Sequence, residues 1–268
     1  MNILLIIDPQ NDFVSPEGAL SVKGAKEDMD RLTDFILHHG KVIDKVIITM
    51  DSHMPGHIST PSYWQDKSGA HPLPFTSISF EDAEKGIWNA STDNAKEYLK
   101  QLEKAGKTHI IWPPHCLFGT YGWTVYEPLY KAAANWAEMY NKEFGFYTKG
   151  MDSRDTEMFS VVKPEVSFDN ETVNSNAERF LSILDGYDAI LIAGEAENFC
   201  VKESVRDIIS MRPNLVSKII ILKDCMSRIP VLGDKTDEFW ESLKIKGMTI
   251  TESRVVDFYK YEVMRQIH

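Results

Sequence analysis

Residues 3–7 read Ile-Leu-Leu-Ile-Ile and lead directly into the polar sequence Asp8-Pro9-Gln10-Asn11-Asp12. A continuous run of β-branched residues and leucine that ends at a polar turn is typical of a strand buried on both faces of a sheet. Similar apolar runs recur at residues 46–50, 109–112, 189–193 and 219–222, with a less clear one at 248–251. The sequence therefore predicts a sheet built from buried strands.

Helical patterns separate these apolar runs. Apolar residues recur at helical spacing over residues 28–39, 95–105, 124–138, 174–184, 201–211 and 236–244. Strands that alternate with helices of this length favour a parallel sheet covered by helices on both faces. We therefore predict an α/β fold, specifically a three-layer α/β/α sandwich with a central parallel sheet.

Residues 1–268 are predicted to form a single domain, because α/β folds of this size commonly share one core. The stretch from about 61 to 91 is rich in proline, glycine, serine and aromatic residues and lacks clear periodicity. We interpret it as a long loop insertion, since loops of this length often serve as lids or contact surfaces. Its aromatic content is compatible with burial against another subunit of a homo-oligomer.

The composition excludes several classes of protein. The chain has 29 Lys and Arg residues against 40 Asp and Glu residues, a formal net charge of −11 that would repel nucleic acid. The apolar N-terminal run is too short for a signal peptide, and no apolar segment reaches membrane-spanning length. Three cysteines, an odd number, argue for thiols in a reducing compartment. We expect a cytoplasmic protein with a small-molecule ligand and neither a nucleic-acid nor a membrane partner.

Polar residues follow each of the first four apolar runs. Asp8 ends the first run, Asp51 and His53 the second, His115 the third, and the segment 194–200 the fourth. The carboxyl ends of parallel strands meet at one edge of a sheet, where ligands bind. We therefore expect these residues to lie close together.

Cys200 begins the helical pattern in which Val201, Val205 and Ile208 share adjoining turns. A helix N-terminus carries partial positive charge and free N–H groups, which lower a thiol pKa and can hold a developing oxyanion. A cysteine is more often a structural core residue, but this location favours a nucleophile.

Asp8 is placed to accept a proton, although a turn aspartate that caps the next segment fits the same pattern. Lys149 lies between aromatic and glycine residues that favour a desolvated site, although most lysines lie at the surface. Glu195 and Glu197 would raise the pKa of a neighbouring thiol unless they point away from it or bind a cationic group. The sequence does not fix their orientation.

Asp51 and His53 lie on the same side of an extended segment, with His57 shortly after them and His115 after the next apolar run. One carboxylate with two or three imidazoles suits zinc, iron or manganese and leaves positions open for water or substrate. Any one of these histidines alone is more often structural, but their common position after apolar runs favours a site for one divalent transition metal, zinc in the first place.

Five motifs occur in an order that resembles a known family. They are Asp8-Pro9-Gln10-Asn11-Asp12-Phe13, Asp51-x-His53 with His57, Trp112-Pro113-Pro114-His115-Cys116 followed by Gly119-Thr120, Tyr147-Thr148-Lys149-Gly150, and Gly194-x-Ala196 through Cys200-Val201. The chain resembles the isochorismatase-like cysteine hydrolases, and among them most closely the nicotinamidases of the pyrazinamidase type. The resemblance implies the isochorismatase-like hydrolase fold.

The resemblance also implies roles for individual residues. It implies a catalytic triad of Asp8, Lys149 and Cys200, an oxyanion hole formed by the N–H groups of Ala196 and Cys200 after a cis peptide, substrate contacts from Phe13 and Trp112, and metal ligands Asp51, His53, His57 and His115. The implied activity is hydrolysis of nicotinamide to nicotinate and ammonia through a cysteine thioester, a step of NAD salvage.

The sequence departs from the family around the expected pocket. Ser52 stands where an aromatic residue is common, Tyr121 and Trp123 replace small residues or proline, and Glu195 and Glu197 are unusual beside the nucleophile. Another small carboxamide, carbamoyl or ureido substrate is therefore an alternative. A protein that binds partners without catalysis is a second alternative, which the complete triad disfavours.

Overall fold

A computed structural model describes residues 1–151, 153–256 and 258 of the chain. Its main sheet has six parallel strands in the order β10-β9-β8-β1-β2-β7. These strands are β1 (Asn2–Ile7), β2 (Lys45–Asp51), β7 (Phe144–Lys149), β8 (Ala189–Gly194), β9 (Ile219–Leu222) and β10 (Thr249–Thr251). The predicted central parallel sheet is confirmed.

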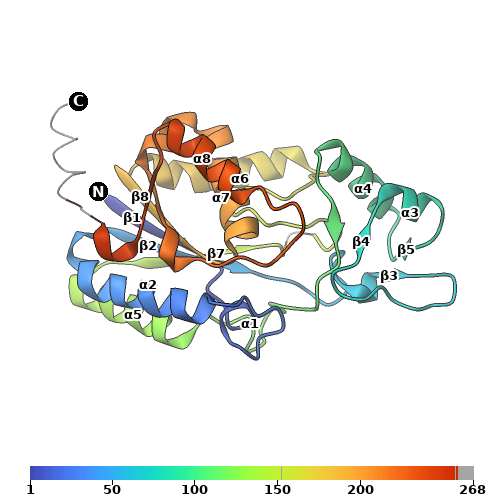
Figure 1. Cartoon of the computed structure of the whole chain (residues 1–268), viewed down its shortest axis with the longest axis horizontal. Coiled ribbons are helices and arrows are strands. Elements are labelled where there is room, and N and C mark those ends of the chain that lie inside the picture. The colour runs from blue at the N-terminus through green and yellow to red at the C-terminus, as the bar shows by residue number, and fades with distance from the viewer. Residues whose placement is uncertain (152, 257, 259–268) are drawn as a thin grey trace.

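Helices cover both faces of this sheet (Figure 1). One face carries α2 (Ala25–His39) and α5 (Glu127–Tyr140), and the opposite face carries α6 (Asn170–Asp185), α7 (Lys202–Met211) and α8 (Thr236–Ile245). The six predicted helical segments all coincide with these helices or with α4 (Asn94–Lys104), within a few residues at each end. The structure is therefore the predicted three-layer sandwich.

Side chains of β1 point alternately to the two faces of the sheet, so this strand contributes to the hydrophobic core on each face. Leu4 and Ile6 pack toward α2 and α5, whereas Ile3, Leu5 and Ile7 pack toward α6, α7 and α8. All five side chains are fully buried, and burial of each contributes roughly 1.5–3 kcal/mol to folding. Because both faces of β1 are covered, an unbroken apolar run forms this strand.

Residues 109–112 were predicted to form a strand of the main sheet, and this prediction is wrong. His109–Ile110 forms the short strand β6, which pairs antiparallel with β4 (Ser77–Ile78) outside the central sheet. The sixth strand of the sheet is instead β7, which the apolar-run criterion did not detect. Only one side of β7 is paired, so its sequence Phe-Gly-Phe-Tyr-Thr-Lys has partly exposed positions and no aliphatic run.

The segment 61–91 is largely ordered into short elements. It contains β3 (Trp64–Gln65), α3 (Phe80–Glu84) and β5 (Asn89–Ala90), with β3 and β5 paired antiparallel. Together with α4 it forms a separate cluster beyond the carboxyl end of the sheet, seen on the right of Figure 1. The fully buried Tyr63 and Trp64 belong to this cluster, so its aromatic residues pack within the chain.

The strand order reverses beside β1. The chain proceeds from β1 to β2 on one side, and later places β8 on the other side. In open parallel sheets such a reversal creates a crevice at the carboxyl ends of the two strands. Asp8 follows β1 and the segment that leads to Cys200 follows β8, so both lie at this crevice.

A remaining helix, α1 (Asn11–Val14), begins three residues after Asp8. In the described part of the chain, no helix has the length and apolarity needed to cross a membrane.

Gly194 provides a test of the close approach between β8 and β1. A β-carbon at this position would lie 2.0 Å from the carbonyl oxygen of Ile7, and the φ angle of +121° is one that side chains rarely adopt. We expect Gly194→Ala to lower the free energy of unfolding in urea by about 3 kcal/mol or more. Gly145→Ala in β7 is the control, because among the described residues no atom lies within 4 Å of its added β-carbon. Equal stabilities of the two variants would contradict this account.

Candidate active site

The residues expected at the carboxyl edge of the sheet do meet there. Asp8 follows β1, Asp51 ends β2 and Lys149 ends β7, and these three strands are neighbours. Cys200 comes from the far side of β1, in the helical turn Glu197–Val201 that precedes α7. All four side chains are at least 95% buried. Parallel pairing in register thus brings together residues that are distant in sequence.

The ammonium group of Lys149 lies at the centre of the cluster. Its Nζ is 3.0 Å from Oδ2 of Asp8 and 2.9 Å from Oδ1 of Asp51. Nζ also donates to the carbonyl oxygen of Met158 and lies 3.6 Å from Sγ of Cys200. Burial disfavours the charged lysine, but Asp51 and Asp8 outweigh this effect and hold its pKa well above the usual value. Lys149 is therefore a buried cation that contacts both carboxylates and the thiol.

Asp8 and Asp51 respond differently to this environment. Burial raises the pKa of Asp8 although Lys149 opposes the rise. Oδ1 of Asp8 accepts a hydrogen bond of 2.6 Å from the hydroxyl of Thr49, which fixes the carboxyl group. Burial would also raise the pKa of Asp51, but His53 and Lys149 hold it well below its usual value. Asp8 is thus the carboxyl group better suited to take up a proton.

The surroundings of Cys200 favour the protonated form of its thiol. Burial raises its pKa well above the usual value, and Lys149 opposes this while Asp8 adds to it. A thiolate would therefore form when its proton leaves for a base such as Asp8. The peptide bond between Glu195 and Ala196 is cis, as the resemblance implied. All three cysteines, Cys116, Cys200 and Cys225, are buried free thiols.

A small pocket opens onto Cys200. Three aromatic rings contribute to its wall: Trp112 packs edge-on against Phe159 and Phe199, with centroids 6.4 and 5.1 Å away. The lining residues are Phe13, Leu20, Asp51, Trp112, His115, Glu157, Phe159, Ala196, Phe199, Cys200 and Ile229. Phe13 and Trp112, for which the resemblance implied substrate contacts, line this pocket, together with Phe159 and Phe199, which the sequence analysis did not name. Such a wall suits a flat aromatic molecule.

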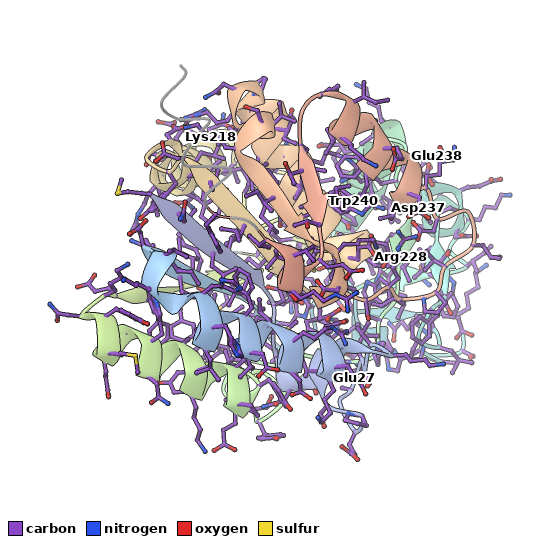
Figure 2. All side chains as sticks on the ribbon, turned by 60° about the vertical axis from the view of Figure 1, so that its left-hand side comes forward. Glu27, Lys218, Arg228, Asp237, Glu238 and Trp240 are labelled. Atoms are coloured by element: carbon purple, nitrogen blue, oxygen red, sulfur yellow. The ribbon has the colours of Figure 1, made fainter. Side chains whose placement is uncertain are left out.

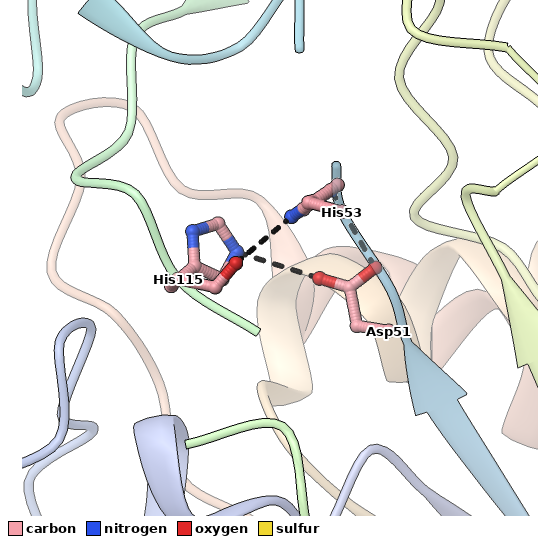
Figure 3. A group of neighbouring side chains, drawn as sticks. All are labelled: Asp51, His53 and His115. Carbon is pink, nitrogen blue, oxygen red and sulfur yellow. Dashed lines mark hydrogen bonds and ion pairs between the residues drawn. The ribbon is translucent and has the colours of Figure 1, made fainter. Parts of the chain in front are cut away.

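A cluster of potential metal ligands borders this pocket (Figure 3). Nε2 of His115 lies 3.4 Å from Oδ2 of Asp51, and Nε2 of His53 lies 3.8 Å from Oδ1 of the same carboxylate. The side chains of all three residues are nearly fully buried. Figure 3 shows that Asp51 and His53 come from the end of β2, and His115 from the opposite chain segment. Three of the four predicted ligands are therefore brought together.

Glu157 adds a second carboxylate that the sequence analysis missed. Its Oε1 lies 3.4 Å from Nε2 of His53, and the two residues form a second cluster with His57. Burial disfavours the charge of His53, but Asp51 and Glu157 outweigh it and raise its pKa to about 9. Glu157 lies in an irregular segment after β7, eight positions beyond Lys149, and no sequence motif marks it.

Both ring nitrogens of His57 are engaged by groups outside the carboxylates of the cluster. Nδ1 is 2.7 Å from the hydroxyl of Ser59, and Nε2 is 3.0 Å from the carbonyl oxygen of Thr156. Burial and the neighbouring His53 lower its pKa to about 4, so the ring is neutral. In this arrangement His57 lies at the edge of the cluster, where Ser59 and Thr156 hold its ring in place.

Gln10 and Trp123 fix the backbone of the cluster. The side-chain amide of Gln10 donates to the carbonyl oxygen of Asp51, at 2.7 Å, and its Oε1 accepts from the Asp51 N–H, at 2.8 Å. The indole of Trp123 donates to the hydroxyl of Ser52, at 2.8 Å. The departures at Ser52 and Trp123 are therefore complementary: the serine forms a hydrogen bond with the tryptophan.

Lys149→Met tests the electrostatic role of the buried lysine. The variant leaves Asp8 and Asp51 buried without their cation, and we expect it to lose about 3–5 kcal/mol of stability near neutral pH. Without the lysine the pKa values of both carboxyls rise, so protonation relieves the repulsion and the loss shrinks as the pH falls. Urea unfolding across a pH series measures this, with the exposed Lys131→Met as control. A loss independent of pH would contradict the assignment.

Comparisons with known proteins agree with the geometry. The chain is 24% identical over 202 residues to a curated nicotinamidase from Saccharomyces cerevisiae, covering 75% of this chain and 78% of that protein. The structure of an Acinetobacter baumanii nicotinamidase and pyrazinamidase superposes with a TM-score of 0.64 at 19% identity, over 94% of this chain and 96% of that one.

A Pyrococcus horikoshii pyrazinamidase in complex with zinc superposes with a TM-score of 0.54 at 17% identity, over 94% and 98% of the two chains. No family model matches the sequence. The chain therefore has the isochorismatase-like hydrolase fold, and the predicted resemblance to nicotinamidases is confirmed in sequence and in fold.

Proposed function

We propose that this chain is a nicotinamidase-type amidohydrolase, which hydrolyses nicotinamide to nicotinate and ammonia through a thioester on Cys200. The observation that carries the proposal is the contact of one buried ammonium, that of Lys149, with both Asp8 and Cys200 beside an aromatic pocket. The sequence similarity to a nicotinamidase supports the choice of substrate. As such an enzyme it would act in cytoplasmic NAD salvage.

In the first half of the reaction, Asp8 takes the proton of Cys200 while the charge of Lys149 stabilises the thiolate. The sulfur attacks the amide carbon, a C–S bond forms, and the carbonyl electron pair moves onto oxygen. The N–H groups of Ala196 and Cys200, at the start of the helical turn, stabilise this oxyanion. The carboxyl proton of Asp8 passes to the amide nitrogen, and ammonia leaves as the C–N bond breaks.

In the second half, a water molecule attacks the thioester carbon and Asp8 accepts its proton. Collapse of the second tetrahedral intermediate breaks the C–S bond and releases the carboxylic acid product. The thiolate recovers its proton from Asp8, which restores the starting site. Asp8 thus moves a proton in both halves of the reaction, consistent with the burial that raises its pKa.

The buried ligand cluster fits a divalent metal. Among the described residues, Nε2 of His53 and Oε2 of Glu157 are buried without a hydrogen-bond partner, although both atoms are good metal ligands. We propose that Asp51, His53 and His115 hold the metal, with Glu157 as a further ligand. His57, which the sequence also suggested, would join them only by giving up its contact with Thr156.

Zinc is the metal that we propose, because carboxylate and imidazole ligands suit it and a pyrazinamidase of the same fold carries it. Iron and manganese are alternatives for the same ligand set. When bound there, such a metal supplies a Lewis acid beside the pocket that can orient a ring nitrogen of the substrate. The chain's own residues contribute the aromatic wall that holds the ring.

A second candidate substrate is another small carboxamide, or a carbamoyl or ureido compound. The feature that favours it is Ile229, an aliphatic residue outside the predicted motifs that lines the pocket among the aromatic rings. The triad chemistry would be the same for these substrates. The aromatic rings around the pocket favour the heteroaromatic amide over the aliphatic ones.

Ammonia release from nicotinamide by the purified, metal-analysed protein tests the proposed activity. We expect turnover that Cys200→Ala abolishes while the metal content is unchanged, because the thiol is the nucleophile and lies outside the ligand cluster. His53→Ala should lose the metal and mainly weaken substrate binding. Turnover by Cys200→Ala comparable to that of the wild type would rule out the thioester mechanism.

The contribution of Glu157 to metal binding is tested by Glu157→Gln. The amide keeps the shape of the side chain but removes its charge, and we expect zinc affinity to fall by about 10- to 100-fold in a competitive chelator titration. Glu197→Gln, an equally buried glutamate outside the ligand clusters, is the matched control. If both variants bind zinc as the wild type does, Glu157 is not a ligand.

A further inference from the structure

The two unusual glutamates of the nucleophile loop, Glu195 and Glu197, flank Ala196. Both are almost completely buried, but neither lines the substrate pocket. Each bonds instead to the segment after β9, where the N–H of Ser227 donates to Oε2 of Glu195 and the N–H of Glu197 donates to the Ser227 carbonyl oxygen. The two glutamates therefore hold the nucleophile loop against the segment after β9, and they do not face the sulfur of Cys200.

Glu197 has the surroundings of an anion. Arg228 donates to both of its oxygens at 2.9 Å, Lys223 donates to Oε2 at 2.5 Å, and the indole of Trp240 donates to Oε1 at 2.6 Å. Arg228 also pairs with Asp234 and with Asp237, and Figure 2 labels Arg228, Asp237 and Trp240. Burial would raise the pKa of Glu197, but these donors lower it below its usual value.

Glu195 has opposite surroundings. Its side chain is fully buried and in hydrogen-bonding contact with the carboxyl group of Asp28 in the first turn of α2. Among the described residues, no conventional donor reaches its Oε1. Asp28, in contrast, accepts hydrogen bonds from Arg31 and from the hydroxyl of Ser227. Two buried carboxyl groups in contact cannot both carry a charge. The donors identify Asp28 as the anion, so the proton belongs on Oε1 of Glu195.

We propose that Glu195 is a neutral carboxylic acid whose proton is donated to Asp28, and that this bond makes it a positioning residue for the loop carrying Ala196 and Cys200. The positioning role rests on the proposed function, whereas the protonation state does not. The backbone N–H of Glu195 also donates to the carbonyl oxygen of Ile7, next to Asp8. The residue thus connects three parts of the molecule: β1, α2 and the segment after β9.

The surrounding charges agree with this assignment. Burial raises the pKa of both carboxyl groups, but Ser227 and Arg31 oppose the rise at Asp28, whereas Asp28 and Glu197 add to the rise at Glu195, whose pKa lies well above its usual value. The cations on the neighbouring elements are already paired: Arg31 of α2 with Asp28, and Lys223 and Arg228 with Glu197. The folded protein therefore binds a proton that the unfolded chain releases above its ordinary carboxyl pKa. The stability contributed by this group is full at acid pH and is lost as the pH rises toward the raised pKa.

The test compares the same isosteric substitution at the two glutamates. Glutamine is neutral and keeps a donor, so Glu195→Gln should reproduce the native bond to Asp28. Its Tm should equal that of the wild type near pH 4 and exceed it increasingly as the pH rises to about 8. Glu197→Gln should instead lower the Tm by about 5 °C near neutral pH, because it leaves Arg228 and Lys223 without their buried anion. A comparable loss of Tm in both variants would overturn the proposal.

Infrared spectroscopy provides a direct readout that requires no substrate. At neutral pH the difference spectrum of wild type minus Glu195→Gln should contain the carbonyl-stretch band of a protonated carboxylic acid, and the difference spectrum of wild type minus Glu197→Gln should not. Absence of this band from the first difference spectrum would disprove the neutral acid. Failure of nicotinamidase activity would leave this measurement unaffected, so the two proposals fail separately.

The positioning role is tested with Glu195→Leu, which keeps the volume but removes the bond. We expect kcat for nicotinamide to fall about 10-fold or more with little change in KM, because the oxyanion contact acts in the transition state. Glu195→Gln should restore kcat. If Glu195→Leu does not fold, the alkylation rate of Cys200 is compared between Glu195→Gln and the wild type. Equal rates indicate that the loop carrying Cys200 is unchanged in Glu195→Gln. A kcat in Glu195→Gln as low as in a folded Glu195→Leu would contradict the role.

Discussion

The buried ammonium of Lys149 is the interaction on which the site depends. Three strands end at a single edge with carboxylates at Asp8 and Asp51, and the crevice removes these charges from water. Without a cation between them, burial and mutual repulsion would favour their neutral forms or open the strand ends. Lys149 comes from the outer strand β7, so this edge strand is required for the site although it contributes little to the core.

Much of the fold was predictable because its signals are local. The run Ile3–Ile7 is buried on both sides, and the helices that flank the sheet have regular apolar spacing, so period and length identified them. Strand β7 was missed because an edge strand needs no continuous aliphatic run. Residues 109–112 were misplaced for the opposite reason: they are buried although they do not pair in the main sheet. His109 and Ile111 pack in the cluster around Trp64, and Ile110 and Trp112 pack against the core on the side of α2 and α5.

The site residues likewise divide into those that the sequence could predict and those that it could not. Asp8, Asp51, His53 and Cys200 follow strands of the main sheet, so the topology of a parallel sheet was sufficient to predict that they would meet. His115 follows β6, which lies outside that sheet, so sheet topology did not account for its position. Glu157 and Phe159 could not be found this way, because they lie in an irregular segment whose path depends on tertiary contacts. The N–H of Glu165 donates to the carbonyl oxygen of Glu157, and the N–H of Val161 donates to the hydroxyl of Ser204 in α7. These contacts, distant in sequence, fix the segment.

The charges of the site indicate why a divalent cation suits it. Asp8, Asp51 and Glu157 are three buried carboxylates, whereas Lys149 is the buried cation that contacts two of them. When all four groups are ionised, the cluster has an excess of two negative charges. The imidazole of His53, between Asp51 and Glu157, responds to this excess through its raised pKa. A bound divalent metal would provide the same compensation and keep His53 as a neutral ligand. Metal binding, the strong pairing of Lys149 and the capacity of Asp8 to carry a proton are thus consequences of one charge balance.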